Sequence, residues 1–104
     1  MSRLKTYNKL VRDKIPEYIE AKGEPVFWHV ATDAEYATKL MEKLLEEVKE
    51  FLAEESIDEF ADLMEVVDAI AAYKKFTPAR IKTIRAAKAA EKGRFKKQII
   101  LERS

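Results

Sequence analysis

Two Ser/Thr-x-x-Glu motifs in the middle of the chain constrain its fold more than any other feature. Thr32 is followed three residues later by Glu35, and Ser56 by Glu59. In such a capping box the hydroxyl accepts a hydrogen bond from a free backbone amide at the start of a helix. Each motif therefore predicts a helix that begins there. Only a few residues join the two helices, so we expect them to pack antiparallel.

Both of these helices carry apolar residues at helical spacing. Such a stripe is typical of a helix that buries one side in a core. The stripe of the first consists of Ala37, Leu40, Met41, Leu44, Val48, Phe51 and Leu52, and that of the second of Phe60, Leu63, Met64, Val67, Ile70 and Ala71.

Single residues mark the limits of the remaining elements. Pro16 fits only the first turn of a helix, and Gly23 supplies a stop signal after it. Thr77-Pro78 is a cap followed by proline at the first helical position, and Gly93 is the next stop. Two runs rich in apolar side chains predict short strands. The expected helices are Asp13 to Lys22, Asp33 to about Glu54, Ile57 to about Lys75 and Pro78 to Lys92, and the expected strands are Pro25 to Val30 and Gln98 to Leu101.

The composition agrees with a single all-α domain over residues 1–104. Apolar residues make up 47% of the chain, which argues against disorder. Two Gly and three Pro are too few turn residues for a β-sandwich. The absence of Cys and the single His exclude zinc–thiolate sites, thiol nucleophiles and multi-histidine metal sites. With no apolar run near the roughly 20 residues of a membrane span and no signal peptide, we expect a cytoplasmic protein without a membrane partner.

The charges are strongly segregated along the chain. Residues 33–68 carry thirteen acidic and three basic side chains, whereas residues 69–104 carry eleven basic and two acidic ones. Two interpretations stay open: oppositely charged helices neutralise each other, or the carboxylates bind a divalent cation and the basic side chains bind its anionic ligand. A nucleic acid polymer is not expected, because the acidic segment would repel its phosphate backbone.

Four acidic side chains of the two central helices are predicted to converge. Glu47 and Glu50 are three residues apart in one helix, and Glu59 and Asp62 are three apart in the next. At about 100° per residue, both pairs flank their apolar stripes on the same rotational side, so they meet in an antiparallel hairpin. Pairing Glu47 with Asp62 also places the turn next to Ser56.

Converging carboxylates repel one another unless a positive charge lies among them. Their hard oxygen atoms suit Mg²⁺, with Mn²⁺ as the alternative. The competing interpretation is an ordinary solvated acidic face on which Glu59 serves its own capping box. Glu65 and Asp68 form a rival second pair, and Glu46 and Glu65 are candidate outer ligands or bases.

These motifs resemble a known group of enzymes. Glu47-x-x-Glu50 followed by Glu59-x-x-Asp62 resembles the signature of the all-α nucleoside triphosphate pyrophosphohydrolases, the MazG-like superfamily. The opening Tyr7-Asn-Lys-Leu-Val-Arg-Asp-Lys-Ile-Pro16 is similar to the start of a small phosphoribosyl-ATP pyrophosphohydrolase-like subgroup, as is the closing stretch 88–102. The resemblance implies a MazG-like antiparallel bundle of about four helices, here with at most a small β appendage. It also implies Mg²⁺ held by the four acids, and cleavage between the α- and β-phosphates that releases a nucleoside monophosphate and pyrophosphate.

The resemblance also gives roles to individual residues. Glu47 or Glu50 would orient the attacking water or accept its proton. We expect basic side chains to bind the phosphates of the nucleotide, with ordinary surface ion pairing as the alternative. These candidates are Lys9, Arg12, Lys14, Arg85 and Lys88.

The sequence leaves the substrate and the assembly open. The expected activity includes removal of non-standard nucleotides. The alternatives are a non-catalytic helical interaction module with the same fold and a true phosphoribosyl-ATP pyrophosphohydrolase. Because a bundle of this size has an apolar surplus, we expect a homodimer or a higher homo-oligomer.

Overall fold

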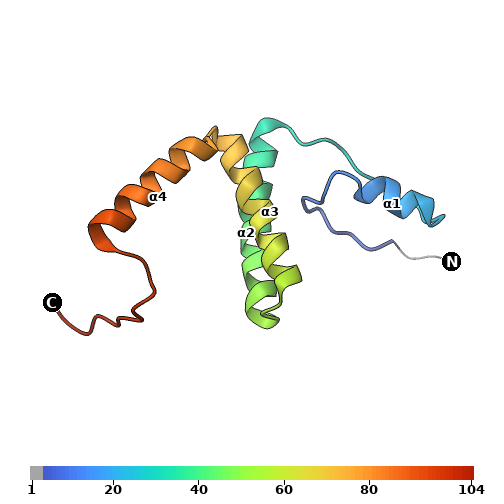
Figure 1. Cartoon of the computed structure of the whole chain (residues 1–104). Coiled ribbons are helices and arrows are strands. Elements are labelled where there is room, and N and C mark those ends of the chain that lie inside the picture. The colour runs from blue at the N-terminus through green and yellow to red at the C-terminus, as the bar shows by residue number, and fades with distance from the viewer. Residues whose placement is uncertain (1–3) are drawn as a thin grey trace.

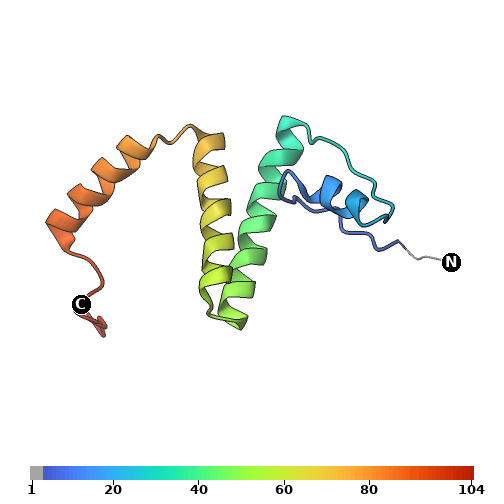
Figure 2. The same ribbon diagram turned by 45° about the vertical axis from the view of Figure 1, so that its right-hand side comes forward.

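The computed structural model describes residues 4–104 and shows an all-α chain over that range (Figure 1). Its helices are α1 (Ile15–Ala21), α2 (Asp33–Ala53), α3 (Ile57–Lys74) and α4 (Pro78–Lys92). Within the described part, α2 and α3 form an antiparallel hairpin and are the only two helices in contact. Figure 2 shows α1 on one side of the hairpin and α4 extending away on the other. The molecule is therefore elongated, measuring 62 × 30 × 24 Å.

Helices α2, α3 and α4 begin where the sequence predicts because local hydrogen bonds fix their first turns. The hydroxyls of Thr32, Ser56 and Thr77 each accept a hydrogen bond from the backbone amide three residues later, at 3.2 Å. These caps satisfy amides that the helix itself leaves free. The α4 bounds agree with the prediction, and α1 starts two residues later than predicted, at Ile15.

The two predicted strands are wrong: no strand forms anywhere in the part of the chain that the structure describes. Residues 25–30 and residues 98–101 are irregular and lie at opposite sides of the hairpin, so neither has a neighbour with which to form a ladder (Figure 1). A strand needs such a partner for its backbone hydrogen bonds. The segment 25–30 is instead tied to α2 through His29 Nε2, which lies 2.9 Å from Glu35 Oε1.

Two aromatic pairs define the register of the hairpin. Tyr36 packs edge-to-face on Tyr73 with ring centroids 5.3 Å apart, and Phe51 packs on Phe60 at 5.6 Å. Eleven residues, about three helical turns, separate Tyr36 from Glu47 along α2 and Tyr73 from Asp62 along α3. The tyrosine pair therefore has the same register as the predicted facing of Glu47 and Asp62.

The α2–α3 interface is rotated by about one residue, or roughly 100°, from the centre of the predicted stripes. Leu40 is fully buried and Val66 is 8% exposed, yet Val67 is 41% exposed. Glu47, one residue before Val48, is only 5% exposed. The predicted stripes are therefore correct in part: Leu40 is buried as predicted, whereas the half of each stripe around Met41 and Val67 faces away from the other helix.

This rotation leaves one side of the hairpin uncovered, which we call the apolar face. Its six side chains are between 40% and 68% exposed. Neither α1 nor α4 packs on α2 or α3, so one chain does not close a four-helix bundle. The apolar face consists of Met41, Leu45 and Leu52 of α2 and Phe60, Met64 and Val67 of α3.

No helix within the described range combines the length and the apolar character needed to cross a lipid bilayer.

Removing the Thr32 hydroxyl tests the contribution of the α2 cap. We expect Thr32→Ala to lower the free energy of unfolding by about 1 kcal/mol, because an amide of the first turn loses its acceptor. Thr38→Ala is the matched control, since the same change inside α2 removes only a hydrogen bond to the carbonyl of Ala34 and improves helix propensity. Urea unfolding followed by circular dichroism measures both; equal midpoints would contradict the role of the cap.

Candidate functional site

Three carboxylates converge at the turn half of the hairpin. One oxygen atom of each of Glu47, Glu50 and Glu59 lies within 4.8 Å of the others. Glu47 and Glu50 lie one helical turn apart on α2, and Glu59 lies in the first turn of α3. The antiparallel packing therefore unites three of the four predicted metal ligands.

Two oxygen atoms of this carboxylate cluster are buried without a hydrogen-bond partner: Oε2 of Glu47 and Oε2 of Glu59. Glu47 Oε1 lies 3.4 Å from Lys43 Nζ. Buried acceptors are almost always satisfied, because an unmet one retains the full cost of leaving water. Among the described residues, however, no donor satisfies either of these two carboxylate oxygens.

Burial and mutual repulsion shift the pKa values of Glu47 and Glu59. Burial raises the pKa of Glu47, and the negative charge of Glu50 raises it further. The pKa of Glu59 is also raised, first by desolvation and then by Glu50 and Asp62. Next to the cluster, a hydrogen bond from Lys9 lowers the pKa of Glu46. The charged form is therefore disfavoured at Glu47 and Glu59 and favoured at Glu46.

The Glu59 side chain does not close its capping box. Ser56 Oγ accepts a hydrogen bond from the Glu59 amide, but the Ser56 amide donates to the carbonyl of Glu54 at 2.8 Å. A closed box would instead use the Glu59 carboxylate as that acceptor. The carboxylate is therefore turned into the cluster.

Asp62, the fourth predicted ligand, is bound by arginine. Arg12 Nη2 donates to Asp62 Oδ1 at 2.8 Å, and Arg12 Nη1 lies 4.0 Å from Glu65 Oε1. In the described part of the chain, neither Glu65 nor Asp68 belongs to a group of converging carboxylates, whereas Glu59 does.

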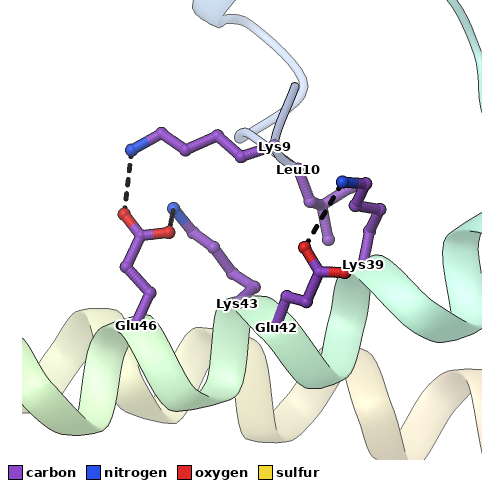
Figure 3. Close-up of a pocket in the computed structure, with 6 residues that line it drawn as sticks. All are labelled: Lys9, Leu10, Lys39, Glu42, Lys43 and Glu46. Atoms are coloured by element: carbon purple, nitrogen blue, oxygen red, sulfur yellow. Dashed lines mark hydrogen bonds and ion pairs between the residues drawn. The ribbon is translucent and has the colours of Figure 1, made fainter. Parts of the chain in front are cut away.

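The segment before α1 reaches α2 through a bend at Asn8. Asn8 adopts a left-handed conformation with φ 47°, which Asn tolerates better than most residues, and its carbonyl accepts a hydrogen bond from Lys39 Nζ at 2.7 Å. Lys9 Nζ then donates to Glu46 Oε1 at 2.8 Å (Figure 3). A cavity of about 160 Å³ at the edge of α2 is lined by Lys9, Leu10, Lys39, Glu42, Lys43 and Glu46 (Figure 3).

Sequence reasoning missed a basic residue beside the cluster. Lys43 lies between two acids, 3.5 Å from Glu46 Oε2 and 3.4 Å from Glu47 Oε1. The available signal was its spacing of three and four residues from these acids, which places all three side chains on one side of a helix.

The five predicted phosphate-binding residues are placed very differently. Lys9 and Arg12 reach the hairpin and pair with acids there. Lys14 is the exposed residue that precedes α1. Arg85 and Lys88 lie on α4, which contacts neither α2 nor α3 within the chain. One chain thus brings two of the five to the cluster.

Comparison with known proteins adds no family. No protein-family model matches the chain, no curated protein matches it, and no solved structure matches it.

Neutralising Glu46 and neutralising Glu47 should change the stability of the fold in opposite directions. The pKa of Glu46 lies below its ordinary value of 4.5, so its charge stabilises the fold above that pH, and this stability is lost as the pH falls through the lowered pKa. The pKa of Glu47 lies above 4.5, so stability falls as the pH rises through that value toward the raised pKa. At pH 7 without divalent cations we expect Glu46→Gln to lower the melting temperature and Glu47→Gln to raise it.

Thermal unfolding between pH 3 and pH 8 measures both shifts. The melting temperatures of both variants should approach that of the unmodified protein in acid, where its Glu46 and Glu47 side chains are protonated. Shifts of the same sign at pH 7 would show that the charge balance described above is wrong.

Proposed function

We propose that this protein is a Mg²⁺-dependent nucleoside triphosphate pyrophosphohydrolase. The observation that carries the proposal is the pair of buried, unpartnered oxygen atoms on Glu47 and Glu59, beside the carboxylate of Glu50. A solvated acidic face would leave these atoms in contact with water. The motifs that resemble the MazG-like enzymes contain the same three residues.

The donor set suits a hard cation. Glu47, Glu50 and Glu59 would hold Mg²⁺, or Mn²⁺ in its place, through carboxylate oxygens. Asp62 would join them when the Arg12 guanidinium turns from it to an anionic ligand. Bound there, the cation would neutralise phosphate charge and lower the pKa of a water molecule.

The remaining roles fall to side chains around the cluster. Arg12 presents a planar guanidinium that binds a phosphate through two parallel hydrogen bonds, and Lys9 and Lys43 supply further positive charge. Glu47, whose raised pKa makes it a stronger base than an ordinary carboxylate, is suited to accept the proton of the attacking water. No Ser, Cys or His nucleophile is required for cleavage between the α- and β-phosphates.

The apolar face supports a homodimer or higher homo-oligomer as the working form. Six partly exposed apolar side chains on one side of a two-helix layer are typical of a surface that packs against another protein. Covering this face would also complete a bundle of four helices, as in the MazG-like proteins that the sequence resembles.

Pyrophosphate release from a panel of standard and damaged nucleotides, with and without Mg²⁺, tests the activity. We expect Mg²⁺-dependent release, and a loss of at least about 100-fold in Glu50→Gln, because removing one charge-stabilising group at a reacting centre typically costs that much. Mg²⁺ should raise the melting temperature of the unmodified protein but not that of the variant. The preferred nucleotide, phosphoribosyl-ATP included, would identify the substrate.

Glu54→Gln is the matched control, since it neutralises an exposed acid one turn further along, at the end of α2 and outside the cluster. It should keep both the activity and the response to Mg²⁺. If no nucleotide is cleaved and Mg²⁺ does not stabilise the fold, the acids are surface charge and the non-catalytic interaction module becomes the better interpretation.

A further inference from the structure

The basic C-terminal part of the chain has no partner within the chain. We call residues 78–97, which comprise α4 and the five residues after it, the basic arm. In the described structure α4 contacts no other helix and buries no residue. In the ion pairs of the described structure, every basic side chain belongs to residues 9–43, and none belongs to the arm. Because isolated helices of about 15 residues are marginal in water, α4 needs a surface on which to pack.

The arm and the hairpin carry opposite charges that are similar in size and lie at corresponding positions. Residues 46–62, the turn half of the hairpin, carry eight acidic side chains and one basic. Residues 85–97, the far half of the arm, carry six basic side chains and one acidic. At about 1.5 Å per residue, α4 is roughly 22 Å long and α3 roughly 27 Å, so an arm that starts at the open end of a hairpin reaches its acidic half.

The joint between α3 and α4 turns the arm away from its own hairpin. The amides of Lys75 and Phe76 bond back to the carbonyls of Ala72 and Ala71, and Lys75 has φ 61°. This left-handed cap ends α3 firmly, and Thr77 starts α4 two residues later with its own side-chain cap. The two views agree that α4 leaves the end of α3 and runs outward (Figures 1 and 2). The arm is therefore presented to another molecule.

A single chain also exposes far more surface than a compact protein of its size. Its accessible surface is 9931 Å², whereas a monomer of 12.1 kDa would expose about 6,000 Å². Its radius of gyration is 18.6 Å, against about 13 Å for a compact chain of this length. The excess of roughly 4,000 Å² per chain exceeds what one side of an obligate homodimer interface needs.

We propose that the basic arm of a second copy of this chain packs on the acidic side of the hairpin. The two copies exchange their arms reciprocally. Each arm runs from the open end of the other copy's hairpin toward its turn. Ile81, Arg85, Lys88 and Lys92 follow one another at spacings of three and four residues, so they lie on one side of α4. This side offers an apolar contact first and then three cations that face the acids near the turn.

The exchange has a consequence for the site that rests on the function proposed above. Arg85 and Lys88, which their own chain holds away from the carboxylate cluster, would complete the phosphate-binding side chains of the other copy's cluster. Each active site would then be built from two chains.

Zero-length cross-linking of the unmodified protein tests the exchange without reference to activity. Unlabelled and ¹⁵N-labelled chains are refolded together, joined between lysine and carboxylate with a carbodiimide, and digested for mass spectrometry. We expect links from Lys88 or Lys92 to acids of residues 46–62 that carry one label from each chain, and a mass in solution of at least two chains.

Two results would overturn the proposal. Links of a single label only would show that the arm folds back on its own hairpin. A mass of one chain, with the arm becoming ordered only when duplex DNA is added, would show that its partner is a nucleic acid.

Complementation tests the shared site. Glu50→Gln and the double variant Arg85→Ala/Lys88→Ala should each be inactive, and a refolded one-to-one mixture should regain about one quarter of the unmodified activity, because half of its dimers are mixed and each has one complete site of two. No recovery in the mixture would overturn the shared site. Mixed-label links in a protein without any nucleotide hydrolysis would support the exchange and reject the proposed function.

Discussion

A carboxylate buried in the turn half of the α2–α3 interface is the constraint on which the rest of the structure depends. Glu47 occupies a position where most helical hairpins place an aliphatic side chain, and it is only 5% exposed; the other buried residues of the described chain, Leu40 and Val66, are apolar. Burying a charge is costly unless it is paired or coordinated. The two sides of the hairpin therefore differ in character. One carries the buried carboxylate and its acidic neighbours, and the other is the exposed apolar face.

Basic side chains of the segment before α1 neutralise the acidic side of the hairpin only in part. Lys9 and Arg12 pair with Glu46 and Asp62 at the rim of the cluster, and the pKa values of Glu47 and Glu59 stay raised. Ion pairs between exposed side chains are weak in water, so little free energy opposes a change of partner by these two cations. This arrangement is compatible with an anion that arrives together with a metal ion and takes over the rim cations.

Features set by neighbouring residues could be predicted from the sequence, and so could the convergence of Glu47, Glu50 and Glu59, because a short turn fixes the register of the hairpin. Features set by contacts between more distant segments could not. The caps at Thr32 and Ser56 depend on side chains three residues away, and they fix both helix starts and the short turn. The predicted strands failed because pairing depends on distant neighbours. The rotation of the interface onto Glu47 was hidden because half of the apolar stripe faces outward, so the centre of the stripe is not the centre of the contact. The pair between Arg12 and Asp62 joins residues 50 apart, and no local pattern indicates it.

The open capping box at the start of α3 makes conflicting demands on one position. For the helix, Gln would serve residue 59 as well as Glu does, because either side chain can close the box on Ser56. For the cluster, only a carboxylate will serve, and its charge repels Glu47 and Glu50. A library of variants selected for heat resistance would therefore drift away from glutamate at this position, whereas one selected for metal-dependent chemistry would keep it. Position 59 is thus a place where tolerance to substitution distinguishes selection on the fold from selection on the site.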